Sequence, residues 1–207
     1  MQISNELPVH AGDPVISIKP KVLFEKSGYN VLSIKIGSHA GTHIDAPFHV
    51  LRQGEKLDSI SLERFIGNAV FIGLEKAENE SITPRDLEGW DIEEEDILIV
   101  STGWEEMKYR QDYFSDFPYF TEESADYLIS KKIKALGVDT PSVDGFSQKG
   151  VFHKKVLGAG IGVIESLINI KPLIGKMMFF SALPLNIKEA DGAPVRAVAI
   201  EGLKIER

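Results

Sequence analysis

Histidine and acidic side chains cluster in one short segment of the sequence. His39, His43, Asp45 and His49 fall within eleven residues, and all four occupy odd-numbered positions. In an extended chain, side chains two residues apart point to the same side, so an extended segment would aim three imidazoles and one carboxylate into one space. Pro47 disfavours a helix across the segment because it lacks a backbone N–H. The segment is therefore predicted to be a strand end or an ordered loop.

These side chains suit a divalent metal ion. Imidazole nitrogen and carboxylate oxygen are ligands for Zn²⁺, Mn²⁺ or Fe²⁺. The sequence has no cysteine, which excludes a thiolate nucleophile, a disulfide and a sulfur-ligated metal. Three or four protein ligands with one open position are typical of a catalytic site rather than a closed structural one. The competing interpretation is a chance cluster of polar loop residues, which the shared register of the four residues disfavours.

Two further candidates lie far along the chain. His153 and Glu165 flank the glycine-containing turn at 158–160. If Gln148–Leu157 forms a helix and Ile161–Ile164 a strand, both side chains can reach one pocket. Taken alone, a single histidine is more often packed or at the surface, and a single glutamate is more often solvated.

The elements that must position these residues are mostly strands. Val31–Ile36 alternates polar and apolar residues and leads directly into the histidine-rich segment. Further expected strands are Ala69–Leu74, Ile97–Val100, Lys134–Val138, Met177–Leu183 and Val195–Ile200. Helices are expected over Thr121–Lys132 and in a short segment capped by Thr83 with Pro84 at its first position. Because strands outnumber helices and do not alternate with them, we predict a mixed, β-rich α/β domain.

Length and charge limit the number of domains and the kinds of partner. A chain of 207 residues is long enough for one domain with a sizeable core, and residues 1–207 are taken as that domain. The net charge of −8 gives no attraction to phosphate backbones, so no nucleic-acid partner is expected. The start of the chain lacks a secretory signal pattern, and the longest apolar run is too short to span a membrane. We therefore expect a cytoplasmic protein with a small-molecule substrate.

The run from His39 to His49, HAGTHIDAPFH, resembles the H-x-G-T-H-x-D-x-P-x-H signature of the cyclase family, which includes bacterial kynurenine formamidases and isatin hydrolases. The resemblance continues at Pro8–Pro14, Gly137–Asp144 and Leu183–Val195. It implies a swivelling β/β/α fold, a homodimer or homotetramer, and metal-dependent hydrolysis of a small amide.

The same resemblance implies the roles of individual residues. The implied metal ligands are His39, His43, Asp45, His153 and Glu165. Asp45 and Glu165 resemble carboxylates that bridge to a second ion, which His153 helps to hold. His49 resembles the catalytic acid/base. The expected cofactor is a divalent metal, Zn or Mn, with one or two ions in each subunit.

One position departs from the family pattern. Kynurenine formamidases carry a tryptophan near the start, in a pattern like V-W-P-G-D, that contacts the aromatic substrate. Here His10 takes that place and Ala11 replaces the proline. His10 is therefore a candidate substrate contact, and its identity weakens the case for N-formylkynurenine while leaving the metal chemistry unchanged.

The leading hypothesis is a metal-dependent hydrolase that cleaves the C–N bond of an aryl formamide or cyclic amide. A metal-activated water would attack the carbonyl, and His49 would carry a proton to the leaving nitrogen. The alternative within this class is N-formylkynurenine formamidase. Alternatives from other classes are an Fe(II)-dependent oxygenase with a His/His/carboxylate triad and a non-catalytic protein that binds metal or ligand. Metal content and oxygen dependence would separate them.

Two segments have two interpretations each. Asp139–Asp144 follows an expected strand, where its polar side chains either satisfy loop backbone groups or line the site. Tyr109–Phe120 contains six of the 18 aromatic residues of the chain. It forms either a local core or, together with Trp104, an apolar wall for a planar substrate.

Overall fold

An eight-stranded mixed sheet forms the centre of the computed structural model, which describes residues 1–203. The strands are β3 (His43–Asp45), β4 (Ile66–Gly73), β6 (Ile97–Ser101), β8 (Ala135–Val138), β9 (Gly162–Glu165), β10 (Met177–Ser181), β11 (Gly192–Pro194) and β12 (Val198–Ile200). Their order across the sheet is β11-β3-β9-β8-β6-β4-β10-β12. The inner strands β4, β6, β8 and β9 run parallel, whereas β3 and β10 pair antiparallel to them.

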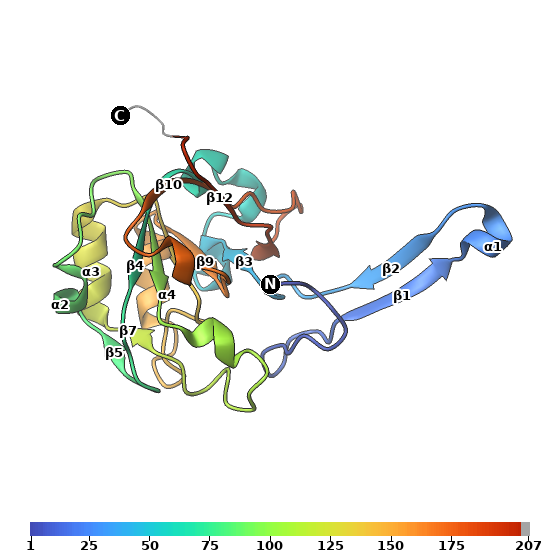
Figure 1. The fold of residues 1–207 in the computed structure, drawn as a ribbon, viewed down its shortest axis with the longest axis horizontal. Coiled ribbons are helices and arrows are strands. Elements are labelled where there is room, and N and C mark those ends of the chain that lie inside the picture. Colours follow the sequence, from blue (N-terminus) through green and yellow to red (C-terminus); the bar gives the residue numbers. More distant parts are fainter. Residues whose placement is uncertain (204–207) are drawn as a thin grey trace.

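The remaining elements lie around this sheet, except for one hairpin that projects away from it (Figure 1). A two-stranded hairpin consists of β1 (Ser17–Val22), α1 (Phe24–Ser27) and β2 (Val31–Lys35), and a small parallel pair consists of β5 (Ser81–Ile82) and β7 (Tyr119–Phe120). The other helices are α2 (Pro84–Leu87), α3 (Glu122–Lys131) and α4 (Val151–Gly158). Short 3-10 helices span Pro47–His49, Leu57–Ser59, Leu62–Phe65, Trp104–Met107 and Lys171–Leu173. Among residues 1–203, no helix has the length and apolar character needed to cross a membrane.

The central strands are apolar on both faces because both faces are covered. Along β4, Val70 and Ile72 join the core that packs against the helices, whereas Ala69 and Phe71 join the core on the opposite face. The same alternation along β6 and β8 supplies both cores. Strands buried on both faces form nearly continuous apolar runs, which is why these segments were identifiable in the sequence. The mixed, β-rich α/β fold is confirmed.

The helix boundaries follow the capping residues. The side chains of Thr83 and Asp86 form a capping box at the start of α2, and Thr121 accepts a backbone hydrogen bond from the first turn of α3. The third predicted helix was placed three residues too early. Gly150 has a left-handed conformation with φ of 73°, so α4 begins only at Val151.

The hairpin corrects one expectation about the strands. Val31–Ile36 was predicted as a strand leading into the histidine-rich segment, and β2 does lie there. It pairs only with β1, however, and the two strands project away from the body (Figure 1). At the other end of the chain, the expected strand 195–200 begins only at Val198.

Candidate metal centre

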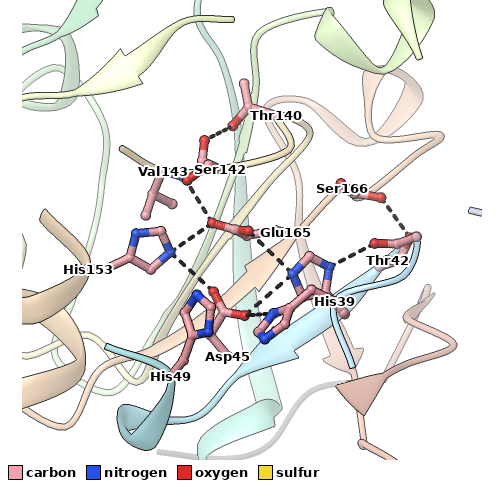
Figure 2. Close-up of polar contacts among 12 residues, drawn as sticks. His39, Thr42, Asp45, His49, Thr140, Ser142, Val143, His153, Glu165 and Ser166 are labelled. Carbon is pink, nitrogen blue, oxygen red and sulfur yellow. Dashed lines mark hydrogen bonds and ion pairs between the residues drawn. The ribbon is translucent and has the colours of Figure 1, made fainter. Parts of the chain in front are cut away.

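The histidine-rich segment and the distant candidates meet at the carboxyl ends of the parallel strands (Figure 2). Antiparallel pairing of β3 with β9 sets His43 opposite Glu165, the last residue of β9. The loop that follows β8 passes beside them, and α4 supplies His153 from the helical layer. In open α/β sheets, ligands bind at this end of the strands because loops of different connections converge there.

Five predicted metal ligands converge on a small volume. Asp45 Oδ1 lies 2.7 Å from His39 Nδ1 and 3.4 Å from His43 Nε2. His153 Nε2 lies 3.1 Å from Asp45 Oδ2 and 3.0 Å from Glu165 Oε1. Glu165 Oε2 lies 3.4 Å from His43 Nε2. All except His39 are at most 5 % exposed as whole residues, so the cluster is shielded from water.

The path of the chain through the cluster differs from a continuous extended segment. Only His43 and Asp45 lie on a strand, and they share a face as the two-residue period predicts. His39 lies in the turn before β3, where Gly41 has a φ of 66°, and His49 ends a 3-10 helix that follows β3. The side chains nevertheless converge, with the His39 ring centroid 4.9 Å from that of His43 and 4.1 Å from that of His49.

Opposite charges stabilise one another inside the cluster. Burial opposes protonation of His43, but its contacts with Asp45 and Glu165 outweigh this effect and raise its pKa to about 10. Burial likewise opposes protonation of His153, whose pKa is raised well above its usual value by neighbouring carboxylates. Burial also disfavours a charged Asp45, yet the surrounding imidazoles hold its pKa well below the usual range. A bound cation would replace these protons, so metal and protons compete for the cluster.

The shared carboxylate indicates that these residues fit a metal ion. Asp45 Oδ1 is buried and has no aligned hydrogen-bond donor among the described residues, although imidazole nitrogens lie near it. A buried carboxylate oxygen without a donor is costly, and a cation would satisfy it. Two possible ligand groups, each with ligand atoms within 4.8 Å of one another, share this residue: His39 with His43 and Asp45, and Asp45 with His153 and Glu165. The donors are nitrogen and oxygen only, as expected for a divalent ion of intermediate hardness.

Each imidazole of the cluster is also held at its outer nitrogen. The three contacts are His153 Nδ1 to Asp144 Oδ2 at 2.5 Å, His39 Nε2 to Asp191 Oδ2 at 3.2 Å, and His43 Nδ1 to the Gly41 carbonyl at 2.8 Å. Metal-binding histidines usually have such a partner, which fixes the ring orientation and the tautomer. The inner nitrogens of all three rings therefore remain directed at the carboxylates of the cluster.

The loop at 139–144 belongs to the site. Asp144 accepts hydrogen bonds from the backbone N–H groups of Phe152 and His153, both at 2.9 Å, and so fixes the first turn of α4. The backbone N–H of Val143 donates to Glu165 Oε1 at 3.0 Å. Asp144 was not among the predicted site residues, although the segment that contains it had been singled out for its aspartates and its position after a strand.

Asp191 is a second residue that the sequence did not assign to the site. It precedes β11, which pairs with β3 and so comes beside the histidine-rich segment. A Cβ atom on Gly192 would lie only 2.6 Å from the Ile44 carbonyl oxygen and 2.8 Å from His39 Cε1. Glycine at this position therefore permits the close approach of β11 that brings Asp191 to His39. The signals available were an Asp-Gly pair, which is common in turns, and the family resemblance of the segment Leu183–Val195 that contains it.

A cavity of about 250 Å³ opens over the cluster. His39, His43, His49 and His153 line it, together with His10 from the beginning of the chain. The His10 ring lies edge-on to that of Phe114, with centroids 5.8 Å apart. His10 thus lies at the pocket, where a substrate contact was expected.

The aromatic segment 109–120 serves both purposes that its composition suggested. Tyr113 and Phe117 pack with Trp104 into a small buried core, and the Trp104 indole N–H donates to the Tyr113 carbonyl at 3.0 Å. Tyr113 and Phe114 also line the cavity. The segment is therefore a packed loop that presents one aromatic wall to the pocket.

His49 differs from the other histidines of the site. Its side chain remains 35 % exposed, and its closest carboxylate oxygen is that of Asp191, 3.9 Å from Nδ1. Burial lowers its pKa, and no close carboxylate reverses that effect. His49 is therefore neutral near pH 7 and faces the cavity.

Comparisons with known proteins agree with the fold and identify the family. The family model described as “Putative cyclase” matches residues 1–145. A kynurenine formamidase of Bacillus cereus is 32% identical over 199 residues, covering 95% of this chain and 92% of the relative. An uncharacterized protein of Methanocaldococcus jannaschii is 34% identical and covers 92% of each chain.

Solved structures also match over nearly the whole chain. A structure titled as a potential metal-dependent hydrolase with cyclase activity matches with a TM-score of 0.82 and 28% identity, covering 96% of this chain and 94% of the other. Isatin hydrolase A from Labrenzia aggregata matches with a TM-score of 0.87 over 96% of this chain and 90% of its own, at 24% identity. That second likeness supports the fold alone.

The fold and the site together define the class of protein as a metal-dependent hydrolase. Within that class, the chain belongs to the Cyclase family.

Proposed function

We propose that this chain cleaves the C–N bond of a small amide, either an aryl formamide or a cyclic amide, with water activated by a divalent ion. The observation that carries the proposal is the convergence of three imidazoles on the two buried carboxylates Asp45 and Glu165, with Asp45 Oδ1 left without an aligned hydrogen-bond donor among the described residues. The similarity to a kynurenine formamidase supports amide hydrolysis over the oxygenase and non-catalytic alternatives.

The ligands divide naturally between one or two ions. His39, His43 and Asp45 would hold one ion, and His153 with Glu165 would hold a second that shares Asp45. Nitrogen and oxygen donors of this kind suit Zn²⁺ or Mn²⁺. When bound, such an ion would lower the pKa of a coordinated water to about 7 and polarise a substrate carbonyl.

His49 would move the proton that the reaction requires. Its ring lies 4.1 Å, centroid to centroid, from that of His39 and faces the cavity rather than the buried carboxylates. Because its pKa is lowered by burial, it is neutral near pH 7 and can accept a proton from the attacking water. It can then donate that proton to the leaving nitrogen.

The cavity is suited to a small planar substrate. Its volume is about 250 Å³, and His10 and Phe114 form an aromatic edge beside it. N-formylkynurenine formamidase remains the alternative within this class, supported by the similarity to kynurenine formamidases. His10, in place of the family tryptophan, argues for a different amide.

A substrate panel tests this function. The chelator-treated protein, reloaded with Zn²⁺ or Mn²⁺, would be assayed with N-formylkynurenine, other aryl formamides, isatin and small cyclic amides. We expect hydrolysis of at least one compound that disappears on chelation and returns with metal. Failure to hydrolyse any compound with metal restored would count against the amidase assignment, and oxygen-dependent turnover with Fe²⁺ would favour the oxygenase.

We also propose the cellular location and the oligomeric state of the enzyme. Residues 1–207 would act as one metallohydrolase domain in the cytoplasm, assembled as a homodimer or homotetramer. Equilibrium sedimentation of the purified chain would measure the assembly directly.

A further inference from the structure

A further group of possible metal ligands lies at the cavity, beside the two buried groups. His39, His49 and Asp191 each offer one ligand atom, and these atoms lie within 4.8 Å of one another. The three residues, here called the outer group, share only His39 with the buried groups. The outer group therefore joins the proposed proton carrier, His49, to a carboxylate that neither buried group contains.

The distances within the outer group suit ligands of one ion. Two atoms bound tetrahedrally at the usual zinc–ligand distances lie about 3.4 Å apart. Asp191 Oδ2 lies 3.2 Å from His39 Nε2 and 3.9 Å from His49 Nδ1, and these two distances bracket that separation. The longer distance exceeds that of a hydrogen bond, so Asp191 does not bind His49 directly. A cation between the three ligand atoms would connect all of them.

The outer group is open to solvent, whereas the buried groups are enclosed. The side chains of His49 and Asp191 are 35 % and 42 % exposed, and that of His39 is 15 % exposed. By contrast, the side chains of Asp45 and Glu165 are at most 5 % exposed. Both imidazoles of the outer group also line the cavity. An ion held there would exchange with solvent and lie where the substrate must enter.

His39 can serve both kinds of site through different nitrogens. Its Nδ1 lies 2.7 Å from Asp45 Oδ1, and its Nε2 faces Asp191. A neutral imidazole has only one free lone pair, so a ring that binds ions at both nitrogens must release its proton to water. This proton release weakens binding of the second ion. The outer group therefore fills after the buried ligands, at a higher concentration of free metal.

We propose that the outer group is an inhibitory metal site, which binds an additional divalent ion such as Zn²⁺ once the buried ligands are filled. The inference rests on the proposed function, because it concerns His49 as the proton carrier. An ion on Nδ1 of His49 takes the lone pair of the ring and leaves the ring proton on Nε2. The ring then cannot accept a proton from the attacking water, so hydrolysis stops. Excess metal thus inhibits the enzyme through the same histidine that serves the reaction.

Inhibition by zinc tests this proposal. Hydrolysis of a responsive amide would be measured over a range of buffered free Zn²⁺ concentrations, and the parent's activity should first rise and then fall. Asp191→Asn removes one of the three outer ligands. The free Zn²⁺ concentration that halves this variant's own maximal activity should be at least about 10-fold higher than the parent's, because even indirect partners of a metal contribute that much to affinity.

Glu189→Gln is the matched control. Glu189 also precedes β11 and loses the same charge on substitution, but its carboxylate accepts a hydrogen bond from Lys56 Nζ at 2.8 Å and does not belong to the outer group. Zinc should therefore inhibit this variant as it inhibits the parent chain. Mg²⁺ at the same concentrations should not inhibit either protein, because it prefers six oxygen ligands.

Metal counting supplies a readout that does not depend on catalysis. Equilibrium dialysis at inhibitory free Zn²⁺ should find one more ion per chain in the parent than in His49→Ala. At the lower free Zn²⁺ that gives maximal activity, the two proteins should bind the same number of ions. Circular dichroism of both proteins checks that they are folded.

Three results would overturn the proposal. They are a lack of inhibition at every free Zn²⁺ concentration at which the parent stays in solution, equal half-inhibition in the parent and Asp191→Asn, and equal ion counts in the parent and His49→Ala throughout. A protein that hydrolyses amides without being inhibited would refute the outer site alone. A protein that hydrolyses no amide would refute the proposed function, and the ion counts would still decide whether the outer group binds metal.

Discussion

Histidine has a raised pKa in the buried part of the site and a lowered pKa in the exposed part. His43 and His153 lie against carboxylates, and these neighbours raise the pKa of each ring despite burial. His49 lies at the cavity without a close carboxylate, and burial lowers its pKa. The difference shows how one fold can give the same side chain two different protonation behaviours. The buried imidazoles keep their protons against carboxylates until a cation displaces them, whereas the imidazole of His49 gives up its proton more readily.

The largest effect is expected when a buried ligand is removed. His43→Ala deletes a ring that contacts both Asp45 and Glu165. We expect loss of bound metal and a fall in turnover to background, because both carboxylates lose their shared partner. Metal analysis and an amide hydrolysis assay on the same preparation provide the check. Full metal content in the purified variant would contradict the ligand assignment.

Replacing the exposed His49 should lower turnover without lowering metal binding. His49→Ala is expected to retain metal but lose about 10²- to 10⁴-fold in kcat, the usual contribution of a general acid/base. The two measurements are metal stoichiometry and steady-state kinetics. Normal turnover by this variant would remove His49 from the mechanism and end the contrast between the two parts of the site.

Replacing Asp144, which contacts the outer nitrogen of His153, should weaken metal binding less than removing His43 does. Asp144→Asn keeps the shape but weakens the contact with Nδ1, and metal affinity is expected to fall about 10- to 100-fold. Asp139→Asn is the matched control, since Asp139 lies in the same loop but binds the Thr102 N–H and hydroxyl instead. Competition with a metal indicator would measure both. Equal loss of affinity in the two variants would indicate a general effect of the loop rather than orientation of His153.

The raised pKa of His43 predicts how the chelated protein responds to pH. A group whose pKa is higher in the folded state stabilises it fully below the unfolded pKa, near 6.5, and loses that contribution as pH rises through the folded value. For His43 that value is about 10. The urea midpoint of the chelated protein should therefore fall between pH 6.5 and 10, and it should fall less in His43→Asn. An identical pH dependence in both proteins would contradict the buried ion pairs.

The smallest effect concerns the substrate. His10→Trp restores the aromatic residue found in kynurenine formamidases at a position beside Phe114. One aromatic contact is worth about 0.5–1.5 kcal/mol, so kcat/KM for N-formylkynurenine should rise roughly 2- to 10-fold, with metal content unchanged. A decrease in kcat/KM for N-formylkynurenine would show that His10 serves this substrate better than tryptophan does.

The sequence predicted the ligands better than the groups that hold them. His39, His43 and Asp45 were identifiable from their close spacing, whereas His153 and Glu165 were noticed on either side of a glycine-containing turn and predicted as ligands only through the family resemblance. Asp144 and Asp191 reach the imidazoles only through the pairing of distant strands and the cap of α4. Both lie in segments that carry the family resemblance, but their residue types and spacing alone do not set them apart from ordinary loop aspartates.

The β1–β2 hairpin shows a different limit of sequence reasoning. The alternation of Val31–Ile36 correctly predicts a strand with one apolar face. It does not distinguish a face that packs against the core of its own chain from one that stays exposed on that chain, as Leu32 and Ile34 do. The histidine-rich segment is a strand end with ordered turns, as predicted, but Gly41 and the 3-10 helix at Pro47–His49 bend the chain on either side of β3, so only His43 and Asp45 share a strand face.

The most direct test of the metal centre is a titration of activity against bound metal. Chelated protein would receive increasing Zn²⁺ or Mn²⁺, with bound metal and hydrolysis of a responsive amide measured at each step, for the parent chain and for His49→Ala. The account predicts that the parent's activity rises in proportion to bound metal and saturates at one or two ions per chain, while the variant binds the same metal without gaining activity. Amide hydrolysis that is independent of bound metal would contradict it.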